Sequence, residues 1–169
     1  MSVDPNQFKA ALGRFCSGVT VITVADERGD HAMTASAFCS LSIDPPLVLV
    51  CVKKNGAMHE RLTEADGFGV NLLDRSQETV SNRFAGWWNK EESKWADLDV
   101  RRAPVSKAAW IGGSLASLDC SVHDRLDGGD HTIFIGKVEN IDVDDRSRDS
   151  LEPLLYFAGQ YRSVAERTT

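Results

Sequence analysis

A run of small and hydroxyl-bearing residues at 34–42, with the sequence TASAFCSLS, contains the residues that most clearly suggest chemistry. Small side chains let a flat aromatic ligand approach the backbone closely, and the neighbouring hydroxyl and amide groups can bond polar atoms on its edge. A flavin ring has such an edge, with carbonyl oxygens and ring nitrogens. A strand rich in serine and threonine with one face in water shows the same pattern, so the run alone leaves both interpretations open.

Positive charge near this run would be needed if the ligand carried a phosphate, because charge-assisted hydrogen bonds to phosphate are the strong ones. Lys53, Lys54 and Arg83 are the candidates, and Arg83 follows Ser81 near the end of a predicted short helix. Each also has an ordinary interpretation as a solvated surface charge.

Three further side chains could lie at the edge of such a site. His131 follows the glycine-rich turn 127–130 and could offer a donor or a cation to a ligand, although an exposed hairpin histidine is the ordinary interpretation. Tyr156 and Tyr161 near the C-terminus are either core aromatics or part of the rim.

Familiar catalytic signatures are missing from the chain. It has no GxSxG nucleophile elbow, no P-loop, no HExxH and no GxGxxG, and no two of its histidines have the i, i+4 spacing of a helical metal site. We therefore expect neither a Rossmann dinucleotide site nor a metal site. The four cysteines form no CxxC pair and lie in or beside apolar stretches, which predicts buried structural thiols at Cys16, Cys39, Cys51 and Cys120.

The elements that must position these residues can be predicted from capping residues and apolar spacing. A helix opens at Asp4-Pro5, carries apolar residues at 8, 12 and 15, and ends at Gly18. Two short helices are expected at 57–65 and 76–84, the second capped by Asp74 or Ser76. Extended segments are expected at 19–24, 32–42, 47–52, 68–73, 118–122, 133–143 and 154–157, with a bulge near Gly136.

About six strands interrupted only by short helices, without βαβ alternation, favour an antiparallel barrel or sandwich over a doubly wound sheet. The segment 87–113 holds all four tryptophans and many charges, and we expect irregular structure or a lid there. No repeat or low-complexity linker divides the chain, so residues 1–169 are interpreted as a single, mainly β domain.

Composition narrows the class of protein further. The chain has 169 residues, 19 Lys+Arg and 25 Asp+Glu, and a net charge of −6, which disfavours a nucleic-acid binder and gives no attraction to an anionic membrane. The longest apolar run, 47–52, is far too short to span a bilayer, and the N-terminus is not a secretory signal. We expect a soluble cytoplasmic protein that binds neither nucleic acid nor membrane.

Six blocks in order resemble the short-chain flavin reductases, the reductase components of two-component flavin-dependent monooxygenases. The resemblance extends from about Phe8 to Arg162, and the blocks are GRFCSGVTVITV, MTASAFCSLSIDPPLVLVCV, FGVNLL, SNRFAG, LDCSVHDRLDGGDHTIFIGKVE and PLLYFAGQYR. It implies an antiparallel, Greek-key-like FMN-binding split β-barrel with short appended helices. It also implies a homodimer with a flavin at each subunit interface, NADH or NADPH as the donor, FMN or FAD as the acceptor, and a separate monooxygenase that receives reduced flavin.

The resemblance also implies roles for individual residues. The isoalloxazine and ribityl groups would lie on Thr34, Ala35, Ser36, Ala37, Ser40, Leu41 and Ser42. The phosphate end would lie on Cys51, Val52, Lys53, Asn55, Ser81, Arg83 and Phe84. His131 would contact the nicotinamide, and Tyr156 and Tyr161 would lie near the site. Many relatives carry Ser and Thr where this chain has Gly56 and Met58, which leaves more of the phosphate binding to backbone N–H groups, Lys53 and Arg83.

Two other functions fit the same sequence. A protein of this fold could hold flavin tightly as a prosthetic group for electron transfer or oxidase chemistry, or it could be a non-enzymatic flavin-binding module. The sequence does not choose between FMN and FAD, or between NADH and NADPH.

Overall fold

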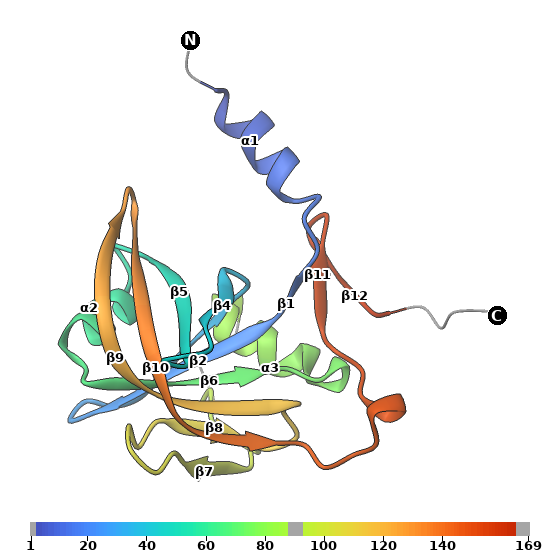
Figure 1. Cartoon of the computed structure of the whole chain (residues 1–169). Coiled ribbons are helices and arrows are strands. Elements are labelled where there is room, and N and C mark those ends of the chain that lie inside the picture. The colour runs from blue at the N-terminus through green and yellow to red at the C-terminus, as the bar shows by residue number, and fades with distance from the viewer. Residues whose placement is uncertain (1–2, 88–92, 165–169) are drawn as a thin grey trace.

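Antiparallel strands make up most of the chain in the computed structural model, which describes residues 3–87 and 93–164 (Figure 1). The helical elements are α1 (Pro5–Leu12), α2 (Ala57–Glu64), η1 (Arg75–Gln77), α3 (Glu78–Asn82), η2 (Arg83–Trp87) and η3 (Arg148–Ser150). The strands are β1 (Ser17–Gly18), β2 (Thr20–Asp26), β3 (Gly29–Ala35), β4 (Phe38–Ser42), β5 (Leu47–Lys53), β6 (Gly67–Leu72), β7 (Val100–Arg102), β8 (Ala109–Ile111), β9 (Ala116–Gly128), β10 (His131–Val143), β11 (Leu155–Phe157) and β12 (Gln160–Arg162).

Seven of these strands form one antiparallel sheet in the order β3-β2-β6-β9-β10-β5-β4. Its two edge strands, β3 and β4, follow one another in the chain and are joined only by Ser36 and Ala37. The backbone N–H of Cys51 in β5 donates to the carbonyl oxygen of Ala37 at 3.0 Å, which fixes this junction against the sheet. The sheet must therefore curl until its edges meet at one corner. We call residues 35–38 the seam.

The curled sheet encloses an apolar core. Val48, Val50 and Val52 alternate along β5 with half-buried neighbours and point inward, as the period of two in a strand requires. Helix α2 covers this core with Met58 and Leu62. One inner face of the sheet and one short helix thus account for the apolar spacing of these segments.

The bulge expected near Gly136 is confirmed, because the β9–β10 register shifts between Ile135 and Gly136. The reason for glycine lies in the packing. A Cβ atom at this position would come within 2.5 Å of the Phe68 ring, and Phe68 is fully buried. The bulge and the missing side chain together let a large aromatic residue fill the core beside β10.

A buried amide connects the sheet to the small β7–β8 sheet. Asn71 on β6 is fully buried; its Oδ1 accepts hydrogen bonds from Ile111 N at 2.8 Å and Ser117 Oγ at 2.9 Å. Its Nδ2 donates to the carbonyl oxygens of Val21 and Ala109, each at 3.2 Å. Every polar atom of this side chain is paired, which is the condition under which a buried amide stabilises a fold.

A second, smaller sheet joins the two ends of the chain. β1 pairs with β11, and β11 pairs with β12. Helix α1 leads from this sheet away from the rest of the molecule (Figure 1). Asp4 caps it and Gly13 ends it, earlier than the expected Gly18, and none of its residues is buried. The expected apolar face is therefore exposed, with Phe8 at 55% and Leu12 at 58%.

Other expectations from the sequence were only partly right. The extended segment 32–42 is divided at the seam, and 76–84 consists of three short helical turns with Asp74 as the first cap. The expectation of irregular structure or a lid at 87–113 was wrong for 100–102 and 109–111. These residues form β7 and β8, and β8 buries Trp110 and Ile111, because it packs against the main sheet through the Asn71 bonds. Trp88 lies outside the described residues.

The Asn71→Leu substitution should destabilise the protein strongly. It leaves the N–H of Ile111 and the hydroxyl of Ser117 buried without their acceptor. We expect the free energy of unfolding to fall by about 3 kcal/mol, measured by urea denaturation. Ser121→Ala, which removes an exposed hydrogen bond on β9, is the control and should change it by less than about 0.5 kcal/mol. Equal effects of the two substitutions would contradict the structural role of Asn71.

Candidate functional site

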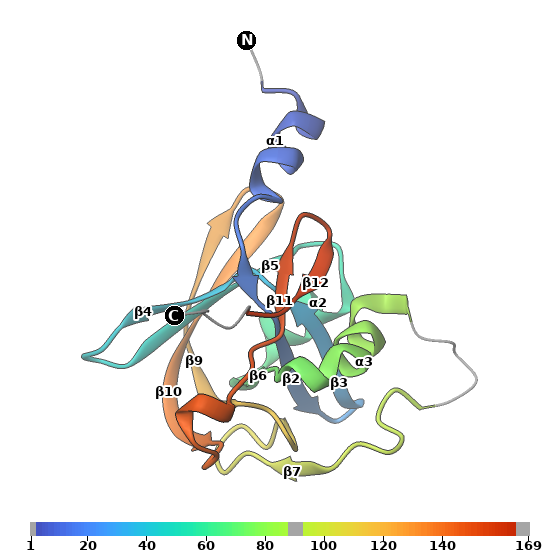
Figure 2. The same cartoon turned by 90° about the vertical axis from the view of Figure 1, so that its right-hand side faces the viewer.

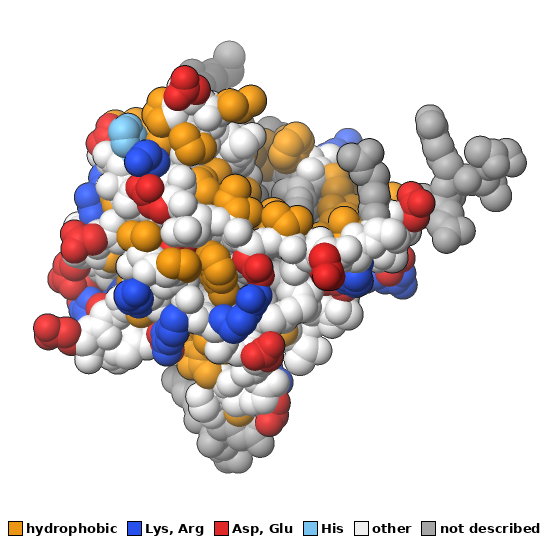
Figure 3. Space-filling view, turned by 60° about the horizontal axis from the view of Figure 1, so that its bottom comes forward, with side chains coloured by type: hydrophobic (Ala, Val, Ile, Leu, Met, Phe, Trp, Pro, Cys, Tyr) orange, Lys and Arg blue, Asp and Glu red, His pale blue; other side chains and the backbone are white. Residues whose placement is uncertain are grey.

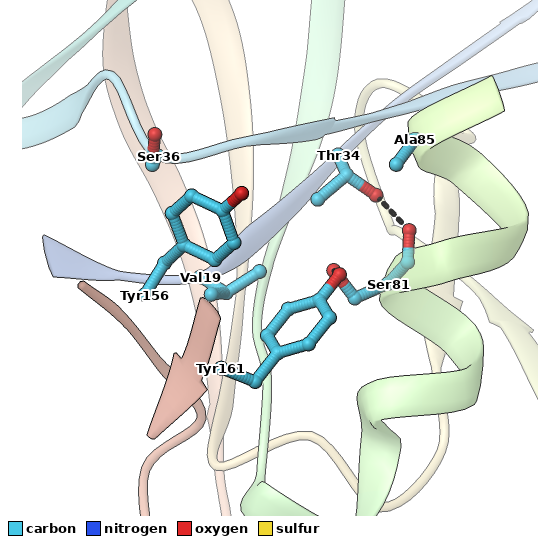
Figure 4. Close-up of a pocket in the computed structure, with 7 residues that line it drawn as sticks. All are labelled: Val19, Thr34, Ser36, Ser81, Ala85, Tyr156 and Tyr161. Atoms are coloured by element: carbon cyan, nitrogen blue, oxygen red, sulfur yellow. Dashed lines mark hydrogen bonds between the residues drawn. The ribbon is translucent and has the colours of Figure 1, made fainter. Parts of the chain in front are cut away.

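A pocket of about 130 Å³ lies where β3, α3 and the β11–β12 hairpin meet (Figure 4). It contains five residues that the sequence predicted for a flavin site. Its lining consists of Val19, Thr34, Ser36, Ser81, Ala85, Tyr156 and Tyr161. Apart from the two tyrosines, these side chains are small, so a planar ligand could approach the backbone closely.

Hydrogen bonds tie three elements together around this pocket. Thr34 Oγ1 donates to the carbonyl oxygen of Ser81 at 2.6 Å, which holds β3 against α3 (Figure 4). Tyr161 Oη donates to Asn82 Oδ1 at 3.0 Å and lies 2.8 Å from Ser81 Oγ, which holds β12 against the same helix. Asn82 was not among the site residues predicted from the sequence. The only feature of the sequence that could have indicated Asn82 was its position directly after Ser81 in the SNRFAG block.

The two tyrosines form an aromatic wall on the C-terminal hairpin. Their ring centroids are 5.5 Å apart in an edge-to-face arrangement. The turn between the strands places Ala158 and Gly159 at φ of 51° and 78°, and Ala158 N donates to Gly13 O at 2.7 Å. The start of the chain thus helps to hold the hairpin that carries both rings.

The short helix α3 is fixed by a buried carboxylate at its start. Asp74 is 5% exposed and accepts hydrogen bonds from the backbone and hydroxyl of Ser76, while Arg146 donates to it at 2.9 Å. Burial pushes the pKa of Asp74 upward, but these hydrogen bonds and the charge of Arg146 outweigh burial and lower the pKa overall. The carboxylate stays ionised and holds Ser81 and Asn82 in place at neutral pH.

A second group of predicted residues gathers at the end of β5 and the start of β10. Lys53 pairs in register with His131, whose Nδ1 lies 2.8 Å from Asp130 Oδ1. Contact with His131, and more weakly the charge of Lys53, lowers the pKa of Asp130. The side chain of Lys53 forms no hydrogen bond or ion pair with any other residue that the structure describes. Its neighbour Lys54 is bonded to Asp127 and to Gly129 O.

The N-terminus of α2 follows directly after Lys53 and Lys54. Gly56 is its N-cap and supplies no side-chain hydrogen bond, so the first N–H groups of the helix are left to other partners. Asn55 lies in the preceding turn and is exposed. Helix N-termini favour anions because of these N–H groups and the helix dipole, so this corner has the donors and the charge that a phosphate requires.

The structure separates the remaining predicted residues from the pocket. Ser40, Leu41 and Ser42 lie on β4, which extends with β5 as a hairpin away from the body (Figure 2). The side chains of Ala35, Val52 and Phe84 are buried in the core, so only their backbones could meet a ligand. Phe84 packs on Trp95 at 4.8 Å. Arg83 Nη1 donates to Ala96 O at 2.6 Å, which draws part of this side chain to the loop 93–98. Ala37 and Cys51 meet at the seam, and His131 does not line the pocket.

Comparison with known proteins identifies the family. The profile of the flavin reductase like domain matches residues 12–165. An NADH-dependent flavin reductase of Rhodococcus sp. is 38% identical over 165 residues, 96% of this chain and 88% of the relative. The flavin-dependent monooxygenase reductase subunit HsaB of Mycobacterium tuberculosis is 36% identical over 168 residues, 99% of this chain and 87% of the relative.

Solved structures agree with these relatives. The NADH:FAD oxidoreductase SgcE6 of Streptomyces globisporus superimposes with a TM-score of 0.87 at 36% identity, covering 98% of each chain. The flavin reductase PheA2 gives a TM-score of 0.87 at 35% identity, covering 97% of this chain and all of the other. The chain therefore belongs to the flavin reductase like domain family. No helix among residues 3–87 and 93–164 combines the length and the apolar character needed to cross a membrane.

The expectation of four buried thiols was wrong for two of them. Cys16 and Cys39 are exposed, Cys51 is half-buried, and only Cys120 is fully enclosed. Burial, with smaller contributions from Asp119 and Glu139, raises the pKa of Cys120 to about 12. The apolar neighbours of these cysteines in the sequence predicted burial. Cys16 instead lies close in the chain to the exposed helix α1, and Cys39 lies on the outer side of the edge strand β4.

These environments predict how the thiols react with a chromogenic disulfide reagent at about pH 8, where only the thiolate attacks. Cys120 should stay unlabelled in the native protein, because a pKa of about 12 leaves almost no thiolate. Cys16→Ser should remove a fast-reacting thiol. Cys120→Ser should leave the native count unchanged and lower the denatured count from four to three. Rapid native labelling of Cys120 would contradict its burial.

Proposed function

We propose that the chain is an NADH-dependent flavin reductase that supplies reduced flavin to a separate flavin-dependent monooxygenase. The observation that carries this is the pocket in Figure 4, which gathers hydroxyl and small side chains from 34–36, α3 and the C-terminal hairpin in one place. Relatives that align over nearly the whole chain are named as NADH-dependent flavin reductases and as monooxygenase reductase subunits. NADH is accordingly the donor that we assign, and both FMN and FAD stay possible acceptors.

The residues present fit a flavin. Ser36 and Ala85 leave room beside the backbone for a flat ring, and the hydroxyls of Thr34 and Tyr161 face its edge. The uncommitted charge of Lys53 and the N-terminus of α2 suit the phosphate end, at the other side of the seam. When bound, the flavin supplies the two-electron acceptor for the hydride of the nicotinamide.

The protein's own part in such a reaction is positioning and electrostatics. No general base is needed for hydride transfer, which agrees with the lack of a triad or carboxylate dyad in the sequence. Tyr156 and Tyr161, which contact each other edge to face, would exclude water from one side of a bound ring. His131, oriented by Asp130, would hold the nicotinamide at stacking distance, about 3–3.5 Å from the acceptor.

A homodimer would complete this site. The pocket of about 130 Å³ is well below the roughly 300–1,000 Å³ of typical ligand sites. Ser40–Ser42 and His131 do not line it within one chain. Apolar side chains are also exposed on the face of the molecule in Figure 3. Over the described residues as a whole, Phe15 is 78% exposed and Ile43 is 93% exposed. We propose that a second copy covers part of this surface and that the curled sheet is a split β-barrel. A monomer in sedimentation equilibrium would contradict the dimer.

The decisive test is the anaerobic oxidation of NADH with FMN, FAD or riboflavin added separately. The reaction is monitored by the loss of nicotinamide and flavin absorbance. We expect turnover with at least one flavin. Survival of a bound chromophore through dialysis would instead favour the tightly held prosthetic group, and no turnover with any flavin would favour a binding module. The cytoplasmic setting expected from the sequence stays a prediction.

His131→Ala should weaken the use of NADH more than it weakens flavin binding. The expected result is a rise of about tenfold in KM for NADH, equivalent to the loss of one hydrogen bond of about 1.4 kcal/mol, with little change in flavin dissociation constant. His123→Ala, at an exposed position on β9, is the matched control and should leave both quantities unchanged. Equal losses in the two quantities would contradict a role for His131 at the nicotinamide.

A further inference from the structure

Two hydroxyl groups in the pocket have already donated their protons to the protein. Thr34 Oγ1 donates to Ser81 O at 2.6 Å, and Tyr161 Oη donates to Asn82 Oδ1 at 3.0 Å. Each hydroxyl has one proton and further lone pairs. What these two oxygens can still offer a ligand is therefore a hydrogen-bond acceptor.

The hydroxyl proton of Tyr161 is used in a hydrogen bond within the protein whichever of its two partners accepts it. Tyr161 Oη lies 2.8 Å from Ser81 Oγ as well as 3.0 Å from Asn82 Oδ1. If the tyrosine donates to Asn82, the serine donates to the tyrosine; if the tyrosine donates to Ser81, its single proton is again used inside the protein. Ser81 is fully buried, so water does not compete for its hydroxyl.

The other two hydroxyls that line the pocket differ. Tyr156 and Ser36 line it as well, but their hydroxyls form no hydrogen bond with any other residue in the part of the chain that the structure describes. These two groups can rotate to donate or to accept. The pocket thus has two hydroxyls that only accept, those of Thr34 and Tyr161, and two that can donate or accept, those of Ser36 and Tyr156 (Figure 4).

We propose that the wall formed by Thr34 and Tyr161 selects a ring edge that donates an N–H group. The inference rests on the proposed function, because it takes this pocket as the place where a ring binds. Two ring edges have the required chemistry, the N3–H of a flavin and the carboxamide NH₂ of a nicotinamide. A carbonyl oxygen in the same place would face the lone pairs of both hydroxyls and leave these half-buried acceptors unpaired, which is unfavourable.

Asn82 is then a positioning residue for this selection. It contacts the tyrosine and not the pocket, since the pocket lining contains Ser81 and Tyr161 but not Asn82. Asn82→Asp keeps an acceptor for the tyrosine proton. Asn82→Leu removes this acceptor, so the tyrosine proton is no longer fixed and can go either to Ser81 Oγ or to a ligand. Selection for an N–H donor should survive the first substitution and weaken in the second.

The experiment compares each ring with a derivative that lacks the N–H donor. One arm measures dissociation constants of FMN and N3-methyl-FMN by fluorescence quenching. The other measures kcat/KM for NADH and for reduced 3-acetylpyridine adenine dinucleotide, in which a methyl group replaces the NH₂. Each ratio is determined in the unmodified protein, in Tyr161→Phe and Thr34→Val, and in the matched control Tyr156→Phe.

In one of the two arms, we expect the preference of the unmodified protein for the N–H form to be about fivefold to tenfold larger than the preference shown by Tyr161→Phe. Tyr156→Phe should keep the full ratio, because its hydroxyl is uncommitted. A response in the flavin arm identifies N3–H as the donor, and one in the donor-analogue arm identifies the carboxamide; either supports the proposal.

Ratios that are the same in Tyr161→Phe, Thr34→Val and the unmodified protein would overturn it. If these variants still change the absolute affinities, the ring site stands and only the selection for a donor fails. If no pocket variant changes any affinity, the placement of the ring in this pocket fails as well. Turnover of NADH with flavin tests the proposed function independently of both outcomes.

Discussion

The curl of the main sheet, which brings its two edge strands together at the seam, is the constraint on which the rest of the structure depends. With only Ser36 and Ala37 between β3 and β4, the strands at opposite ends of a seven-stranded sheet must meet. The hydrogen bond from Cys51 N to Ala37 O fixes that meeting. Burial of the valines of β5 against Phe68 and α2 supplies the apolar driving force. The hydroxyl-rich run therefore lies at the corner of the sheet where its edge strands meet, and Ser36 and Ala37 at that corner are exposed to solvent.

The helix α3 converts this corner into a pocket. It is too short to be stable by itself, and its position depends on the Asp74 cap, on Arg146 and on the bonds to Thr34 and Tyr161. Because both contacts use α3 as the acceptor of a hydroxyl proton, the same bonds that assemble the pocket set its polarity. The assembly of the pocket and the polarity of its hydroxyls thus depend on one small set of hydrogen bonds.

Local pairing also makes the charge of this acidic chain differ from place to place. The net charge of −6 describes the whole molecule, but the charge where β5 ends and α2 begins depends on which cations are neutralised. Lys54 is paired with Asp127, while Lys53, one residue earlier, has no such partner in the described part of the chain. The two adjacent lysines contribute equally to the net charge, but within the described residues only the charge of Lys54 is neutralised by an ion pair.

The sequence by itself determined the features that depend on neighbouring residues. These are the strand periods, the Asp4 cap, the bulge at Gly136 and the small hydroxyl side chains at 34–42, because dihedral preference and side-chain alternation act over a few positions. Its ordered motifs also indicated the family. Only the tertiary structure decided features that depend on distant contacts, such as the strands within the tryptophan-rich segment, the burial of Val52 and Phe84, and the exposure of α1. The commitment of the Thr34 and Tyr161 protons belongs to this second group, because their acceptors lie 47 and 79 residues away in the chain.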